Sequence, residues 1–327
     1  MVSVLSQELI FQAVKSLAPP LSYEGHKGQS GRIGLIGGSK EYTGAPYFAA
    51  ITALRIGADL AHVFCPPEAA PVIKSYSPEL IVHPLLTEDT PLSVESISPW
   101  LPRLHSIVIG PGLGRDNAIL RTVKELLKLA KEQEKNIIID ADGLYLITND
   151  PQPIKGYPNC ILTPNKIEFD RLYHKVVRIR SYFCIIGTFQ FQFSSPPSGS
   201  QYQTETMDLA RALGGVTIVR KGLHDVISNG QQVLSCEEEG SPCRKGGQGD
   251  LLSGCLGVCS YWAQLAKEHN RLTLKETELP LTLLASYTSC LIVKKCARLT
   301  FKRLGRSLLA CDMVDNVGGV SCELFDQ

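Results

Sequence analysis

Short runs of aliphatic residues alternate along this chain with longer segments whose apolar residues recur at helical spacing. Five of the runs are apolar enough to be buried strands: 32–37, 106–110, 136–140, 159–162 and 216–219. Between them, residues 44–57 and 117–131 show helical spacing, and Asp116 is positioned to cap the second helix. Strands that are apolar on both faces need helices on both sides. The pattern therefore predicts an α/β fold, a mostly parallel central sheet with helices on both faces.

Glycine and polar residues follow each predicted strand. These segments are Gly37-Gly38-Ser39, Gly110-Pro111-Gly112-Leu113-Gly114-Arg115, Asp140-Ala141-Asp142-Gly143, Thr163-Pro164-Asn165 and Lys221-Gly222. In a parallel sheet the carboxyl ends of the strands meet at one edge, and ligands bind beside that edge. We therefore expect these segments to surround one binding site.

Several residues in these segments have two readings. Asp140 and Asp142 could bind Mg²⁺ through water or cap the next helix, and we favour the cap for Asp142. Asn165 and Glu168 have the spacing of a capping box, although either could also face a substrate. Lys221 could place its ammonium group near nucleotide phosphates, or it could be an ordinary surface lysine at the end of a strand.

A glycine cluster, Gly246-Gly247-Gln248-Gly249-Asp250, leads directly into an apolar helical pattern. Glycine lets the backbone approach a ligand closely, and the first N–H groups of a helix have no intrahelical partner, so this segment is suited to binding an anion. A polyphosphate would repel Asp250 unless that carboxylate has a task, such as accepting the proton of an attacking hydroxyl. An ordinary loop-to-helix turn is the alternative. Neither a GxGxxG fingerprint nor a P-loop is present.

Composition narrows the class of protein. The chain has 327 residues, 44% of them hydrophobic, and a formal charge of +1 without a basic stripe, so we expect no nucleic-acid or membrane partner. No signal-peptide pattern follows Met1, and the eleven cysteines lack metal-ligand spacing. We expect a cytoplasmic protein with reduced thiols, mitochondrial only in forms with a different N-terminus. We expect one domain over residues 1–327. The sequence is also compatible with a homo-oligomer.

Residues 178–204 interrupt the alternation of strands and helices. A Phe-Gln alternation at 189–193 is followed by a Ser/Pro tract typical of a linker. We interpret the segment as an insertion. Its apolar side chains, Ile185, Ile186, Phe189, Phe191 and Phe193, are predicted to be exposed or loosely packed and prone to β-aggregation.

Taken in order, these motifs resemble those of a known family, the ATP-dependent NAD(P)H-hydrate dehydratases of the ribokinase-like superfamily, in their eukaryotic form. The segments that carry the resemblance are Tyr42-Thr43-Gly44-Ala45-Pro46, Gly110-Pro111-Gly112-Leu113-Gly114-Arg115, Asp140-Ala141-Asp142-Gly143-Leu144, Leu162-Thr163-Pro164-Asn165 and Gly246 through Gly254. The resemblance implies a ribokinase-like three-layer sandwich. The activity it implies is ATP-dependent dehydration of the S form of NADHX or NADPHX, which returns NADH or NADPH with ADP and phosphate.

The resemblance also implies roles for particular residues. Asp250 would be the catalytic base, and the N–H groups of Gly247, Gln248 and Gly249 would form an anion hole for the γ-phosphate. The hydrated coenzyme would contact Asp250 together with Gly114, Asn165, Lys166, Ile167, Glu168, Phe169, Asp170 and Arg171. ATP would contact Lys221, Gly222, Leu223, His224, Asp225, Gly240, Ser241, Pro242, Cys243, Arg244, Lys245, Gly246, Gly247, Gln248 and Gly249. Mg²⁺ is implied by the ATP chemistry, without named protein ligands.

Two other functions fit the same residues. A ribokinase-type kinase of a small alcohol would use the same anion hole and the same Asp250, but it would release a phosphorylated product. A non-catalytic nucleotide-binding protein would bind ATP without turnover.

Overall fold

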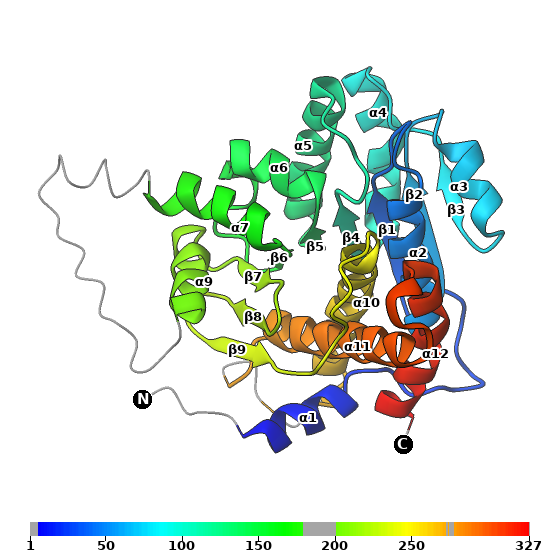
Figure 1. The fold of residues 1–327 in the computed structure, drawn as a ribbon. Helices are drawn as coiled ribbons and strands as arrows, with labels where there is room; N and C mark the ends of the chain where they lie inside the picture. Colours follow the sequence, from blue (N-terminus) through cyan, green and yellow to red (C-terminus); the bar gives the residue numbers. More distant parts are fainter. Residues whose placement is uncertain (1–5, 179–200, 273, 275–277, 327) are drawn as a thin grey trace, which may run out of the picture.

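The computed structural model describes residues 6–178, 201–272, 274 and 278–326. A nine-stranded sheet crosses the molecule in the order β3-β2-β1-β4-β5-β6-β7-β8-β9 (Figure 1). The strands are β1 Arg32–Ile36, β2 Leu60–Phe64, β3 Ile81–His83, β4 Ser106–Ile109, β5 Asn136–Ile139, β6 Cys160–Leu162, β7 Thr217–Arg220, β8 Asp225–Ser228 and β9 Val233–Cys236. Strands β1 to β7 run parallel, and β8 and β9 are antiparallel additions at one edge.

All five strands expected from the sequence are confirmed, as β1, β4, β5, β6 and β7. The other four, β2, β3, β8 and β9, were not predicted. Strand β3 has only three residues, and β2 carries a histidine at its centre. Strand β8 begins with aspartate and ends with serine, and β9 includes a serine, so neither forms a continuous aliphatic run.

Helices cover both faces of the sheet, as expected (Figure 1). On one face lie α1 Gln7–Lys15, α2 Gly44–Ile56, α3 Ala70–Tyr76, α10 Gln248–Glu268, α11 Leu281–Leu304 and α12 Ala310–Phe325. On the other face lie α4 Thr90–Ile97, η1 Ser98–Arg103, α5 Asn117–Glu132, α6 Asp142–Asn149, η2 Gln152–Ile154, α7 Lys166–Tyr173 and α9 Gln201–Ala212. Two short turns, η3 His174–Arg178 and η4 Gly305–Ser307, extend α7 and α11.

Side-chain alternation along each strand produces these two cores. In β4, Val108 belongs to the core under α2 and α10, whereas Ile107 and Ile109 belong to the core under α5. All three side chains are at most 1% exposed. A strand buried on both faces must be apolar at every position, which is why these strands were readable as continuous aliphatic runs. The fold is a three-layer α/β sandwich.

Helices α2 and α5 occur where the sequence predicted them. Asp116 caps α5, since its carboxylate accepts from the N–H groups of Ala118 and Ile119. Among the described residues, no helix is sufficiently long and apolar to span a bilayer.

The predicted insertion at 178–204 needs a correction at its end. Residues 201–204 form the first turn of α9. The Tyr202 carbonyl accepts from Thr206 Oγ1 at 2.7 Å, and the Tyr202 ring lies 4.0 Å from the Arg220 guanidinium. These residues therefore belong to the packed fold. The apolar side chains at 185, 186, 189, 191 and 193 lie outside the described residues.

Helix α10 packs against α2 through Gly254. A Cβ built at Gly254 would overlap the backbone carbonyl of Ala49, and one at Gly257 would lie 3.0 Å from Ile33 and 3.1 Å from Val108. Backbone cannot move aside as a flexible side chain can. The position of α10 on the sheet thus depends on glycine at these two sites.

We predict that Gly254→Ala destabilises the protein by about 1–3 kcal/mol, the usual cost of overpacking a core. Gly319 is the matched control, since it lies within α12 and a Cβ there would meet no atom within 4 Å. Gly319→Ala should stabilise the fold by about 0.5–1 kcal/mol, because alanine lowers the conformational entropy of the unfolded chain. Urea unfolding of the two variants measures both changes in the free energy of unfolding. Changes in the same direction would contradict the packing argument.

Candidate active site

Polar side chains gather at the carboxyl ends of β5, β6 and β7. Asp140 follows β5, Thr163 follows β6 and Lys221 follows β7. Asp140 is 2% exposed, and its Oδ1 accepts from Thr163 Oγ1 at 2.7 Å and from Lys221 Nζ at 2.9 Å. Three of the five strand ends expected to surround one site therefore meet around one buried ion pair.

The amino terminus of α10 lies against this ion pair. Gly247 is the residue before the helix, with φ 92°, and a Cβ there would overlap Ala310. A Cβ at Gly249 would lie 3.1 Å from Lys221 Nζ and 3.6 Å from Asp140 Oδ2. Gly247 has no side chain that could cap the helix. The first N–H groups of α10 are therefore available to an anion. The geometry agrees with an anion hole at residues 247–249.

Asp250 occupies the first turn of the same helix. Partial burial raises the pKa of Asp250 well above its usual range, the Asp140 carboxylate raises it further, and Lys221 opposes both effects. A carboxylate with a raised pKa is a stronger base than an ordinary aspartate, and this is the usual tuning of a general base. Asp250 can thus accept a proton beside the uncapped amino terminus of α10.

Lys221 and Glu168 share this electrostatic environment. Burial opposes the charge on Lys221, but the carboxylates of Asp140 and Glu168 outweigh it and raise the lysine pKa. Burial also raises the pKa of Glu168, against the favourable effect of Lys221. Lys221 is therefore the cation of a cluster with three carboxylates, those of Asp140, Glu168 and Asp250.

The predicted capping box at the start of α7 is confirmed. Asn165 Oδ1 accepts from the Glu168 N–H, and Glu168 Oε2 accepts from the Asn165 N–H at 2.8 Å. Five predicted substrate-contact residues of this segment are exposed: Asn165, Lys166, Ile167, Asp170 and Arg171. Glu168 thus joins the capping box to the charged cluster.

Phe169 does not fit its predicted role. Its side chain is 1% exposed and belongs to the core beneath α7, where the ring lies 3.8 Å from the Arg220 guanidinium. Arg220 is itself 4% exposed and pairs with Glu205 at 2.8 Å. The sequence motif 165–171 did not distinguish Phe169 from its exposed neighbours, because residues within one helical turn face both the core and the solvent.

The predicted capping role of Asp142 is wrong. Asp142 is the first residue of α6 rather than the one before it, and no side chain caps that helix. Its Oδ2 accepts from the Gly114 N–H at 3.0 Å, and its Oδ1 lies 3.2 Å from Arg115 Nε. Asp142 therefore fixes the glycine loop after β4, the loop that contains the predicted substrate contact Gly114.

A lysine that the sequence did not single out supports the turn after β7. Lys294 of α11 is 9% exposed, and its Nζ donates to the carbonyls of Gly222 at 3.2 Å and Leu223 at 2.7 Å. Asp225 is 7% exposed, accepts from the Gly222 N–H at 2.9 Å and lies 3.6 Å from Lys294. The Asp225 side chain is thus engaged in holding the turn, and its contact with ATP stays a prediction. Gly222, Leu223 and His224 remain exposed.

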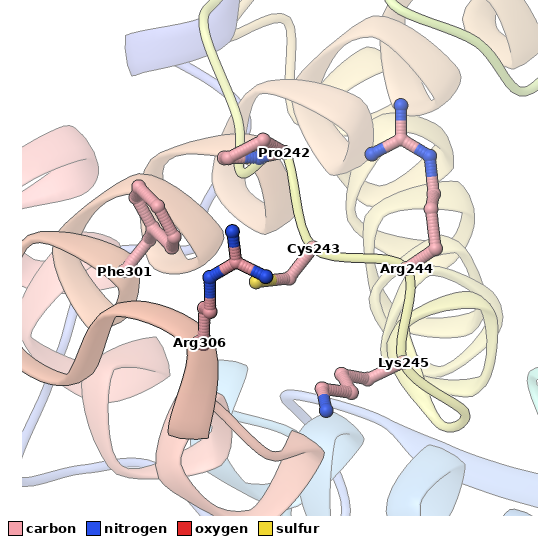
Figure 2. Close-up of a pocket in the computed structure, with 6 residues that line it drawn as sticks. All are labelled: Pro242, Cys243, Arg244, Lys245, Phe301 and Arg306. Carbon is pink, nitrogen blue, oxygen red and sulfur yellow. The ribbon is translucent and has the colours of Figure 1, made fainter.

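The loop before α10 borders a cavity of about 530 Å³. Pro242, Cys243, Arg244 and Lys245 line it from the loop, and Phe301 and Arg306 line it from the end of α11 and from η4 (Figure 2). Gln248 Nε2 donates to the Cys243 carbonyl at 3.2 Å and ties the loop to the helix. Neither Phe301 nor Arg306 is among the predicted ATP contacts, and more than fifty residues separate them from the loop.

Comparison with known proteins shows which family this chain belongs to. The family model described as NAD(P)H-hydrate dehydratase matches residues 33–317. The human ATP-dependent (S)-NAD(P)H-hydrate dehydratase is 48% identical over 324 residues, covering 99% of this chain and 87% of the human one. Two solved structures share the fold. The ADP/ATP-dependent NAD(P)H-hydrate dehydratase of Bacillus subtilis, co-crystallised with ATP and Mg²⁺, has a TM-score of 0.65 and 20% identity, covering 96% and 97% of the two chains. A ribokinase-like superfamily protein of Enterococcus faecalis has a TM-score of 0.70 and 18% identity, covering 99% and 96%.

The family match spans the sheet, the glycine loops and the helix that carries Asp250. On that match and on the identity to the human relative, the chain belongs to the NAD(P)H-hydrate dehydratase family.

Proposed function

We propose that this protein dehydrates the S form of NADHX and NADPHX at the expense of ATP, returning NADH or NADPH with ADP and phosphate. Relatives that are about half identical over nearly the whole chain bear this activity in their names. The observation that carries the proposal is the position of Asp250, which has a raised pKa in the first turn of α10 and lies beside the open N–H groups of residues 247–249.

The chemistry follows from the leaving group. Hydroxide leaves carbon poorly and phosphate leaves it well, so phosphorylation of the C6 hydroxyl makes dehydration easy. Asp250 accepts the hydroxyl proton while that oxygen attacks the γ-phosphorus, and the bond to the β-phosphate breaks to release ADP. The N–H groups of Gly247, Gln248 and Gly249 stabilise the charge that develops on the transferred group. Loss of phosphate from C6, with a proton from the adjacent carbon, restores the nicotinamide double bond.

Residues at the same edge would hold the two substrates. We propose that Gly114, Glu168 and the exposed residues of α7 bind the hydrated coenzyme. Lys221, with Gly222, Leu223, His224 and the segment 240–249, would bind ATP. Lys221 is suited to this role because it already carries its charge among carboxylates and lies next to Gly249.

The described residues fit a magnesium ion that arrives with the nucleotide. They contain no group of three His, Cys, Asp or Glu side chains that could hold an ion by themselves. Mg²⁺ usually binds through one or two carboxylates, substrate phosphates and water. Asp140, whose Oδ2 lies near Gly249, is the carboxylate best placed for this. When bound, the ion would neutralise phosphate charge.

The direct test incubates the protein with NADHX and Mg-ATP and follows nicotinamide absorbance and free phosphate together. A dehydratase restores the absorbance of NADH and releases one phosphate for each molecule restored. A small-alcohol kinase would yield a phosphorylated product without free phosphate, and a non-catalytic binder would consume no ATP. Either of these results would overturn the proposal.

We predict that Asp250→Asn lowers kcat by at least about 10²-fold, because the amide keeps the shape but cannot accept a proton. The melting temperature should not fall, since the substitution removes a charge whose burial is costly. Turnover of NADHX and thermal unfolding provide the two measurements. Activity near that of the wild type would exclude Asp250 as the base.

The raised pKa of Asp250 predicts an acid limb in the pH profile. The base works only when deprotonated, so kcat/KM is full above the pKa of Asp250 and falls as the pH drops through it. Since burial and Asp140 raise this pKa, the limb should lie above the value near 4 that an ordinary aspartate would give. A limb at about pH 4 would contradict the assignment.

We predict that Gly249→Val weakens ATP binding and turnover while binding of the hydrated coenzyme changes little. The branched side chain would fill the space between the helix terminus, Lys221 and Asp140, where a Cβ alone lies within 3.1 Å of Lys221 Nζ. Gly249→Ala should show the same defect to a smaller degree. Calorimetry with Mg-ATP gives the affinities, and an unchanged affinity in the valine variant would place the anion hole elsewhere.

A further inference from the structure

The cavity beside residues 242–245 is lined by three cationic side chains and by no acidic one. Arg244 and Lys245 come from the loop, and Arg306 comes from η4 on the opposite side. Its volume of about 530 Å³ lies in the range typical of small-molecule sites. Phe301 and Pro242 supply the apolar part of the lining. A cavity of this composition favours an anionic ligand.

Two of the three cations are free to bind such a ligand. Arg244 Nη1 donates to the Ser241 carbonyl at 2.9 Å, so that its guanidinium is engaged with the loop. Throughout the described ranges, neither Lys245 nor Arg306 makes an ion pair, and both are exposed. Figure 2 shows both side chains extending toward the space between the loop and η4, whereas Arg244 extends away from it.

The loop that lines the cavity leads directly into the proposed anion hole. Lys245 lies two residues before Gly247, and Gln248 holds the Cys243 carbonyl through its side chain. On the opposite side, Cys243 Sγ lies 3.8 Å from the Gly305 carbonyl, next to Arg306. A polyphosphate whose last phosphate reaches the N–H groups at 247–249 would therefore carry its other phosphates past Lys245 and Arg306.

We infer that Arg306, together with Lys245, binds the α- and β-phosphates of the nucleotide in this cavity. The inference rests on the proposed use of ATP and adds to it a positioning residue from outside the glycine-rich loop. Arg306 acts by holding the part of the nucleotide that remains in ADP, while residues 247–249 hold the γ-phosphate. A guanidinium suits this role because it can donate two parallel hydrogen bonds to phosphate oxygens.

Cys243 provides a direct probe of occupancy. It lines the cavity and is partly exposed, whereas Cys322 is exposed on the last turn of α12, outside the cavity lining. Alkylation by iodoacetamide, mapped by mass spectrometry, compares the two thiols in the same sample. The measurement needs no turnover, so it remains informative even if NADHX is not a substrate.

Mg-ATP and Mg-ADP should each slow alkylation of Cys243 about tenfold at ten times their Kd, because only the unoccupied protein reacts. Adenosine at the same concentration should give no protection, since it lacks the phosphates. Cys322 should react at the same rate throughout. If calorimetry shows Mg-ATP bound while Cys243 reacts at its free rate, the phosphates lie elsewhere and the inference is wrong. If adenosine protects as well as ATP, the cavity holds the nucleoside instead, and the inference is again wrong.

The second test replaces the guanidinium. Arg306→Met should weaken binding of Mg-ATP and Mg-ADP by about ten- to a hundredfold, the usual effect of losing hydrogen bonds to a charged group. The KM for ATP should rise accordingly, with the KM for NADHX unchanged. Arg303→Met is the matched control, since Arg303 is an exposed cation in the last turn of α11 and does not line the cavity.

Equal effects of the two substitutions would reduce the role of Arg306 to general surface charge and overturn the inference. Failure of the proposed function has a different signature, in which wild-type protein binds Mg-ATP and Cys243 is protected but NADHX is not turned over. Absence of Mg-ATP binding by the wild-type protein would overturn both.

Discussion

The close approach of α10 to the sheet and to α2 is the constraint from which the candidate site follows. Only glycine fits at 254, where the backbone of Ala49 occupies the space of a side chain, and Gly257 lies equally close to β1 and β4. With the helix held at this depth, its amino terminus lies against Asp140 and Lys221. The same helix thus packs the core with one half and presents free N–H groups with the other.

The charges at that terminus oppose stability. Asp140, Glu168 and Asp250 lie around one lysine, and burial raises the pKa of both Glu168 and Asp250. Such a cluster costs free energy in the absence of ligand, because three carboxylates share one cation in a partly dry environment. For a phosphoryl-transfer site the cost is useful, since it keeps a strong base and a cation fixed where charge moves during the reaction.

The turn after β7 and the loop before α10 depend on contacts from helices far along the chain. Lys294 of α11 holds the turn after β7, and Gly305 and Arg306 of η4 face the loop before α10. The C-terminal helices therefore support loops whose sequence motifs all precede them. Substitutions in α11 should accordingly be examined for nucleotide affinity as well as for stability.

The sequence by itself determined the sandwich, five of its strands, the caps of α5 and α7 and the glycine-rich helix start with Asp250. These features are local: a doubly buried strand is a continuous apolar run, a cap is set by neighbouring residues, and a helix that opens on glycine exposes its own N–H groups. The short or mixed strands β2, β3, β8 and β9 left no such signal. Only the tertiary structure decided that Phe169 lies in the core, that Asp142 serves the Gly114 loop and that Asp225 pairs with Lys294. It alone placed Arg306 at the cavity. Each of these depends on which distant element packs opposite the residue, and spacing along the chain does not carry that information.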